Sequence, residues 1–358
     1  MNEVLKHITV VIPSLEPKME LVRYILQLIE RGVKDIVVVN DGSDSTFDPI
    51  FTKIRELDVC EVLVHKENYG KGTALKTAYR YIQEYRTNTQ GIITVDSDGQ
   101  HTVDDVCKVA ETLSIHWDSL VLGGRSFKSS EIPFKSKIGN RSTSCLFYLL
   151  YGKWFEDTQT GLRGFGIQLL DDMLRIEGER FEYEMQVLIQ CIVRKIPITT
   201  VLIETIYDNN NEGTHFQVMR DSVRIMKVLF GNFVKFCCSS LMGAVTDIAT
   251  AWFLLDFLKP YFLNNDFVRI GLAVSGARVL SICVNYTINR KVVFKESASS
   301  KRTLIKYLCL CIIIMCASVV LVYLGHSVVG MSDKVAKVMA DIVLFGVSYE
   351  VQRRWVFR

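Results

Sequence analysis

The feature that most limits the fold is a series of four long apolar runs in the second half of the chain. They cover about residues 233–258, 267–288, 304–328 and 335–351. Each is close to the length of about 20 residues that an α-helix needs to cross a bilayer. Buried helices of a soluble protein are the alternative, but four such runs in succession favour membrane spans. The sequence therefore predicts an all-α domain with four transmembrane helices over residues 233–358.

Basic residues around these runs predict how the chain is oriented in the membrane. Residues 218–232 have the pattern of an amphipathic helix lying on an anionic membrane surface, with Arg220, Arg224 and Lys227 on it. Other basic residues lie between the second and third runs and after the fourth: Arg290, Lys291, Lys295, Lys301, Arg302, Lys306, Arg353, Arg354 and Arg358. The positive-inside rule then predicts a multi-pass membrane protein whose termini and N-terminal domain are cytoplasmic.

The apolar half also contains an internal repeat. Tyr, Arg and Val-Phe recur at the same spacing in Asn285–Phe294 and in Ser348–Phe357, which predicts a duplicated helix hairpin. Charged residues at the depth of a span normally pair with one another. We therefore expect Arg278 to pair with Asp247 or Asp341.

The first half alternates short apolar, β-branched runs with helix patterns. Strand-like runs cover residues 8–13, 36–39, 62–64 and 92–95. This alternation predicts an α/β domain, a mainly parallel sheet with helices on both faces. The net charge of +3 argues against a general nucleic-acid binder. The 10 cysteines include no Cys-x-x-Cys pair, which indicates neither a zinc site nor a disulfide framework but reduced thiols.

Polar residues follow the predicted strands. Asp41 follows the second strand, Gly70-Lys71-Gly72 begins a helix, and Asp96 and Asp98 follow the strand at residues 92–95. The carboxyl ends of strands are where open α/β sheets bind ligands, and Mg²⁺ or Mn²⁺ prefers carboxylates together with substrate phosphates. Each feature alone is equally typical of a polar turn, and the Walker pattern is missing. Several polar strand ends in one sheet favour a ligand site.

These motifs carry a resemblance to a known family. Val11-Ile12-Pro13-Ser14, Val39-Asn40-Asp41-Gly42-Ser43, Asn68-Tyr69-Gly70-Lys71-Gly72 and Asp96-Ser97-Asp98-Gly99-Gln100-His101 resemble family-two glycosyltransferases in order and spacing. The nearest branch is similar to polyprenyl-phosphate sugar synthases such as dolichyl-phosphate mannose synthase. The resemblance implies a GT-A (Rossmann-like) catalytic domain over residues 1–217. Residues 233–358 resemble the GtrA-like membrane domain.

The resemblance also implies roles for individual residues. It assigns Pro13, Glu16, Asp41, Lys71 and Asp96 to a nucleotide sugar, although the family often has Asn where this chain has Glu16. It assigns Asp96, Asp98 and Gln100 to Mg²⁺ or Mn²⁺. The implied acceptor-phosphate residues are Arg125, Lys135, Lys137, Asn140, Arg141 and Arg163, and the implied catalytic residues are Asp96, Asp98, Asp157 and Arg125.

Three residues to which the resemblance gives a role also have a purely structural interpretation. His215 lies in a stretch that resembles the family's loop over the donor phosphates, but a lone histidine is equally often structural. Lys135 and Lys137 could belong to a solvated basic loop. Relatives often carry Arg at the position of Lys137. The Lys ammonium is a point charge and cannot make the paired hydrogen bonds of an Arg guanidinium.

The resemblance predicts metal-dependent transfer of one sugar from a UDP- or GDP-linked donor to a membrane polyprenyl phosphate, and it implies inversion at the anomeric carbon. The product would be a lipid-phosphate-linked sugar for cell-envelope glycans; glucose, galactose, N-acetylglucosamine and mannose all fit, and homo-oligomers occur among related transferases. One alternative is a processive polysaccharide synthase. Such enzymes carry the motif Gln-x-x-Arg-Trp near the membrane, and Gln352-Arg353-Arg354-Trp355 is one residue short of it. The other is a non-catalytic lipid-linked sugar translocase or scaffold, against which the intact Asp-x-Asp argues.

Overall fold

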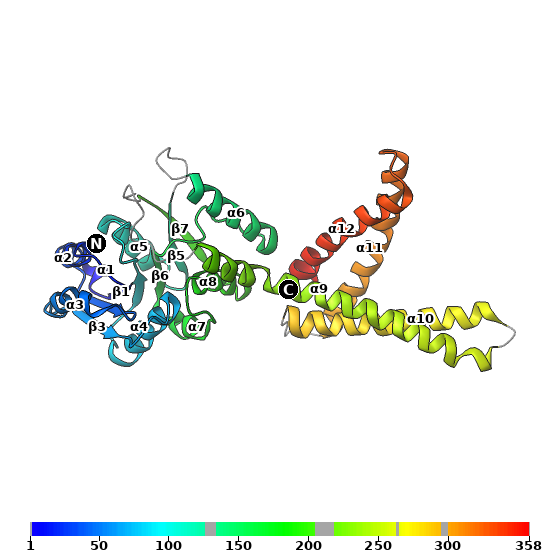
Figure 1. Cartoon of the computed structure of the whole chain (residues 1–358), viewed down its shortest axis with the longest axis horizontal. Helices are drawn as coiled ribbons and strands as arrows, with labels where there is room; N and C mark the ends of the chain where they lie inside the picture. The colour runs from blue at the N-terminus through cyan, green and yellow to red at the C-terminus, as the bar shows by residue number, and fades with distance from the viewer. Residues whose placement is uncertain (1, 126–133, 205–217, 263–264, 295–299, 358) are drawn as a thin grey trace. The chain divides into compact units, whose positions relative to one another are not determined.

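The computed structural model describes residues 2–125, 134–204, 218–262, 265–294 and 300–357. The chain divides into two compact units, Met1–Leu229 and Phe230–Arg358. The first unit is α/β and the second consists of helices, as Figure 1 shows. The predicted fold class, an α/β domain followed by an all-α domain, is therefore confirmed.

A seven-stranded sheet forms the centre of the first unit, in the order β3-β2-β1-β4-β6-β5-β7. Strand β6 is antiparallel to both of its neighbours, and the other pairs are parallel. The sheet is therefore mainly parallel, as the alternating pattern predicts. The strands are β1 Ile8–Ser14, β2 Asp35–Asn40, β3 Cys60–Val64, β4 Gly91–Thr94, β5 Leu120–Arg125, β6 Arg163–Gly166 and β7 Ile198–Ile203.

Helices cover both faces of this sheet, which is why every residue of β1 and β4 is buried. One face packs against α1 Asn2–Leu5, α2 Glu20–Arg31, α3 Asp48–Arg55 and α5 Val103–Ile115. The other packs against α4 Lys71–Tyr85, α7 Leu170–Arg175 and α8 Glu182–Val193. The remaining helices outside the second unit's bundle are α6 Phe134–Tyr151 and the 3-10 turns Ser45–Phe47 and Ile167–Leu169.

The order of the strands brings the polar strand ends together. Strand β1 lies between β2 and β4, and all three run parallel. Ser14, Asp41 and Asp96 therefore emerge side by side at the carboxyl edge of the sheet. Helix α2 follows β1 and ends at Arg31, because Gly32 takes the left-handed conformation (φ 109°) and its N–H caps the last turn.

Four long helices build the membrane part: α9 Val218–Phe257, α10 Asp266–Ile288, α11 Ser300–Ser327 and α12 Asp333–Val351, with a 3-10 turn at Lys259–Tyr261. The amphipathic segment expected at residues 218–232 and the first expected span form the single helix α9. Within the described residues, three helices are long and apolar enough to cross a membrane: Arg220–Phe257, Phe267–Val293 and Lys301–Ser327. Helix α12 is not among them, so the fourth span stays a prediction.

The internal repeat is visible in the second unit. Helices α10 and α12 both end in a π-helical turn, η4 Asn289–Val293 and η5 Gln352–Val356. Asn289 and Gln352, 63 residues apart in the chain, are joined by a side-chain hydrogen bond of 2.9 Å. The expected ion pair is also present, because Arg278 Nη2 lies 3.3 Å from Asp247 Oδ2.

Candidate active site

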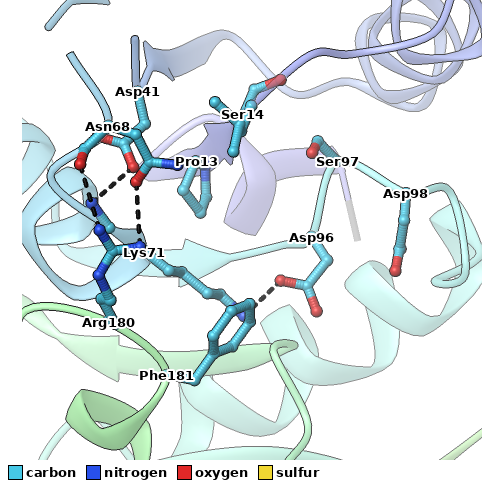
Figure 2. A pocket seen from close by; sticks show the side chains of 12 residues that line it. Pro13, Ser14, Asp41, Asn68, Lys71, Asp96, Ser97, Asp98, Arg180 and Phe181 are labelled. Carbon is cyan, nitrogen blue, oxygen red and sulfur yellow. Dashed lines mark hydrogen bonds and ion pairs between the residues drawn. The ribbon is translucent and has the colours of Figure 1, made fainter. Parts of the chain in front are cut away.

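A cavity of about 140 Å³ opens at the carboxyl edge of the sheet (Figure 2). It is formed by the ends of β1, β2 and β4 and by the starts of α4 and α8. The lining residues are Pro13, Ser14, Leu15, Asp41, Asn68, Gly70, Lys71, Asp96, Ser97, Asp98, Arg180 and Phe181. The structure thus brings together Pro13, Asp41, Lys71, Asp96 and Asp98, which the sequence analysis selects from four separate motifs.

Lys71 lies at the centre of this cavity, in the first turn of α4. Its Nζ is 2.6 Å from Asp96 Oδ1 and 2.8 Å from Glu184 Oε1. The same atom lies 5.7 Å from the centre of the Phe181 ring. Burial alone would disfavour the ammonium, but the two carboxylates outweigh it and raise the pKa of Lys71 above its ordinary value. Lys71 is therefore a fixed positive charge on the cavity wall.

The two carboxylates of the Asp-x-Asp motif have different environments. Burial opposes ionisation of Asp96, but the Lys71 ammonium and His101, whose Nε2 is 3.7 Å from Asp96 Oδ2, hold its pKa far below the usual range. For Asp98, desolvation in the cleft and the negative charge of Asp96 raise the pKa. The Asp98 carboxylate accepts a hydrogen bond of 3.1 Å from the Gln100 N–H. Asp96 is thus permanently charged, while Asp98 gains a proton more readily.

The position of the Asp96 carboxylate depends on Gly161, which begins the approach to β6. A Cβ at Gly161 would lie only 2.1 Å from Asp96 Oδ2. Any other residue there would displace the carboxylate, because non-bonded heavy atoms normally stay about 3.5 Å apart.

The donor set at this cavity fits a divalent cation held jointly with a ligand. In the described part of the chain, no group of three or more His, Cys, Asp or Glu side chains that could hold a metal is preassembled. Mg²⁺, however, is usually bound by one or two carboxylates, with waters and substrate phosphates completing its shell. Asp96 and Asp98 line one cavity and supply such a pair. Gln100 is half-buried, does not line the cavity, and contributes its backbone N–H to Asp98.

Asp41 holds the loop that leads into α4. Its Oδ1 accepts hydrogen bonds from His65 Nδ1 at 2.7 Å and from the Tyr69 N–H at 3.0 Å, and its Oδ2 accepts one from the Gly70 N–H at 2.8 Å. Glu16 differs: its side chain is exposed and does not line the cavity, while its N–H donates to Ser43 Oγ at 2.8 Å.

A second group of predicted residues gathers at the end of β5. Arg125 Nε donates to Asp157 Oδ2 at 2.5 Å, and Asp157 is fully buried. Asn140 Nδ2 donates to the Glu156 carbonyl at 2.5 Å, so α6 is tied to the same segment. The Arg141 side chain is exposed. The structure therefore joins Arg125, Asn140 and Asp157, whereas the side chains of Lys135 and Lys137 and the whole of His215 lie outside the described residues.

Arg163 has a different environment from the other predicted phosphate ligands. It is buried, and its guanidinium donates to the carbonyls of Thr160, Glu184 and Thr158 at 2.9, 2.7 and 3.4 Å. These contacts fix the start of α8 against β6. These donors are directed at backbone carbonyls in the interior, and the role of Arg163 as an acceptor-phosphate residue stays a prediction.

Sequence reasoning gave no role to Arg180, Phe181 or Glu184, which all reach this site. The Arg180 guanidinium donates to the side-chain and backbone oxygens of Asn68, each at 3.4 Å, across 112 positions of the chain (Figure 2). The run Arg180-Phe181-Glu182-Tyr183-Glu184 resembles the family's pattern at the start of a helix, and Glu184 could equally be an N-terminal helix charge. The resemblance assigns none of these residues a contact with Lys71.

Two family models match the chain. Residues 9–169 match glycosyl transferase family 2, and residues 235–357 match the GtrA/DPMS transmembrane domain. The chain is a family 2 glycosyltransferase with a GtrA/DPMS transmembrane domain. It is therefore an integral membrane protein, and the cavity around Lys71 and Asp96 lies in its glycosyltransferase domain.

The chain is also similar to individual proteins. The glycosyltransferase is 31% identical over 212 residues to an uncharacterized protein of Methanocaldococcus jannaschii, covering 58% of this chain and 84% of that one. It is 28% identical over 236 residues to the UDP-N-acetylglucosamine–dolichyl-phosphate N-acetylglucosaminyltransferase of Methanococcus voltae, covering 60% and 91%. Among solved structures, glucosyl-3-phosphoglycerate synthase from Mycobacterium tuberculosis superposes with a TM-score of 0.49 at 15% identity, covering 64% of this chain and 79% of that one.

Proposed function

We propose that this glycosyltransferase transfers a single sugar from a UDP- or GDP-linked donor to a membrane polyprenyl phosphate, with inversion at the anomeric carbon. The observation that carries the proposal is the cavity in which Lys71 contacts Asp96 beside Asp98, in a family 2 domain that continues into a membrane domain. The match to a relative named as a dolichyl-phosphate N-acetylglucosaminyltransferase supports the choice of acceptor.

Asp96 and Asp98 would hold Mg²⁺ or Mn²⁺ in this proposal. When bound, the ion neutralises charge on the leaving diphosphate as a Lewis acid and orients it. Lys71 adds a fixed positive charge at the same place, and the first turn of α4 presents backbone N–H groups suited to phosphate. Asp41 keeps the loop before α4 in position beneath the nucleotide.

The acceptor needs to be oriented more than activated. A phosphate monoester has its second pKa near about 6 and is largely dianionic at neutral pH, so it attacks without a strong general base. Arg125 and Arg141, with Asn140, Lys135 and Lys137, would hold this phosphate in line with the anomeric carbon. The buried Asp157 carboxylate orients the Arg125 fork rather than removing a proton.

The proposed organisation keeps the predicted boundaries. The catalytic domain covers residues 1–217, the interface segment 218–232 and the four-span GtrA-like domain 233–358, with the catalytic domain and both termini in the cytoplasm. The processive alternative loses its support. Gln352 is buried in a π-helical turn and bonded to Asn289 and Ser348, so it is not presented to a glycan.

The test is an assay of Asp98→Ala in membranes given labelled nucleotide sugars (UDP-glucose, UDP-galactose, UDP-N-acetylglucosamine and GDP-mannose in turn) and polyprenyl phosphate. We expect lipid labelling to fall by about 10²-fold or more, since the metal supplies several kcal/mol of transition-state stabilisation. Asp58→Ala, at an exposed aspartate outside the cavity, is the matched control. Wild-type labelling by Asp98→Ala would reject metal-assisted transfer at this site.

A further inference from the structure

The two π-helical turns of the membrane unit are equivalent in sequence and in position. Such turns are rare and frequently occur at functional sites. Asn289 begins the first turn and Gln352 the second, and their side chains bond to each other in the interior. Phe294 and Phe357 follow the two turns and stack with ring centres 5.1 Å apart. The repeats therefore meet through equivalent residues, and each turn carries two basic residues after its buried amide.

The start of α11 lies beside both turns. Tyr286, at the end of α10, shares a hydrogen bond of 2.6 Å with Thr303 near the start of α11. Lys306, one turn further along α11, donates to the Trp355 carbonyl of η5 at 2.7 Å. The exposed side chains of Lys301 and Arg302 therefore belong to the same end of the unit as the turns.

One position distinguishes the two copies. In the second copy, Glu350 accepts hydrogen bonds from Arg353 at 2.6 and 2.8 Å and lies 2.7 Å from Arg354 Nε. The equivalent position in the first copy is Thr287, whose hydroxyl donates to the Cys283 carbonyl at 2.7 Å. The second turn thus carries a carboxylate that compensates its two arginines, and the first turn has a neutral residue at that place.

We propose that the first π-helical turn binds the phosphate of a lipid headgroup, with Lys291, Lys301 and Arg302 as the cationic contacts. All three side chains are exposed at one end of the helix unit. Lysine and arginine are the residues that bind phosphate, and clusters of them beside a span recognise anionic lipids. This site lies in the membrane domain and goes beyond the sugar transfer proposed above.

The surroundings favour a lipid over a soluble anion. The turn ends a helix long and apolar enough to cross a membrane, Phe267–Val293. Val292, next to Lys291, is 50% exposed, and Ile305 on α11 is 62% exposed. A ligand with a phosphate and an apolar chain matches this combination of exposed charge and exposed apolar surface. Both a phospholipid diester and a polyprenyl phosphate monoester have that chemistry.

The experiment exchanges the residue that differs between the copies. Full-length protein in neutral phosphatidylcholine nanodiscs is titrated with phosphatidylglycerol or with polyprenyl phosphate, and bound lipid is counted by native mass spectrometry. Thr287→Glu places a carboxylate three and four residues before Arg290 and Lys291, as Glu350 is placed in the second copy. We expect about fivefold weaker binding, the effect of losing roughly one cation. Thr287→Gln, which adds length without charge, is the matched control.

Comparing the binding of the two lipids shows which kind of lipid supplies the phosphate. Weaker binding of both lipids by Thr287→Glu supports a general headgroup site, and weaker binding of polyprenyl phosphate alone supports an acceptor site. Unchanged binding of both by folded Thr287→Glu overturns the proposal, as does an equal loss in Thr287→Gln. Asp98→Ala should bind both lipids like the wild type, so a failure of the proposed transfer reaction would not be mistaken for a failure of this site.

Discussion

Replacing Gly161 with alanine should disable the site while leaving the fold intact. The new Cβ would lie 2.1 Å from Asp96 Oδ2 and 2.4 Å from Asp96 Cγ. Ordinary contacts between such atoms are about 3.5 Å, so the carboxylate must move by about 1.4 Å. The obstructing atoms belong to a side chain rather than to backbone. Rotation of Asp96 out of its preferred rotamer costs about 1 kcal/mol, which the folded state tolerates.

The same displacement should also impair catalysis. A shift of that size breaks the 2.6 Å contact between Lys71 and Asp96 and misplaces one of the two carboxylates proposed for the metal. A displacement of about 1 Å can cost about 10²-fold in rate, which corresponds to about 2.7 kcal/mol in the barrier. Initial rates of labelled-sugar transfer to polyprenyl phosphate, measured over a range of Mn²⁺ concentrations, should show a kcat/KM lower by that factor.

The control for this variant is Gly271→Ala in α10, because a Cβ there meets no atom within 4 Å. It should keep wild-type activity. The melting temperature of each variant separates a misplaced carboxylate from a damaged fold. A folded Gly161→Ala protein with wild-type kcat/KM and wild-type Mn²⁺ dependence would refute the role given to the Asp96 position.

Two further predictions concern buried groups of the first unit. Glu184→Gln removes one of the two carboxylates that hold Lys71, so we expect kcat/KM for the nucleotide sugar to fall by on the order of tenfold; a wild-type value in the transfer assay would contradict this. Burial raises the pKa of Cys191 to about 12, so almost no reactive thiolate exists at neutral pH. Alkylation followed by mass spectrometry should therefore modify the exposed Cys145 first, and Cys191 only after denaturation; equal rates in the folded protein would disprove it.

Local sequence pattern was sufficient to predict the first four strands and the core of the site. Asp41 and Asp96 directly follow buried strands, and parallel topology alone carries their side chains to one edge. Glu184 and Arg180 could not be assigned in this way. They reach Lys71 and Asn68 only because α8 packs against α4, a contact between segments more than 100 positions apart. The surroundings of Arg163 were also not predictable from its motif, since its guanidinium binds backbone carbonyls in the interior.

The helices of the membrane half were predictable from the sequence, apart from the start of α9. The change from an amphipathic to an apolar pattern near residue 232 suggested two segments, yet α9 continues through it. Gly231 is the most helix-weakening residue near that point in the sequence, and one glycine costs a helix about 1 kcal/mol, too little to end it. The π-helical turns, where Asn289 bonds to Gln352 across the repeat, had no local signal.

The bonds made by Asp41 change how its variants should be understood. Its carboxylate accepts hydrogen bonds from the backbone N–H groups of Tyr69 and Gly70. His65, which also bonds to this carboxylate, is in turn hydrogen-bonded to Thr77 on α4 at 2.9 Å. Removing the carboxylate therefore releases the segment that presents Lys71. Weaker nucleotide binding by an Asp41 variant would therefore follow from the loosening of that segment, even without a contact between the carboxylate and the base.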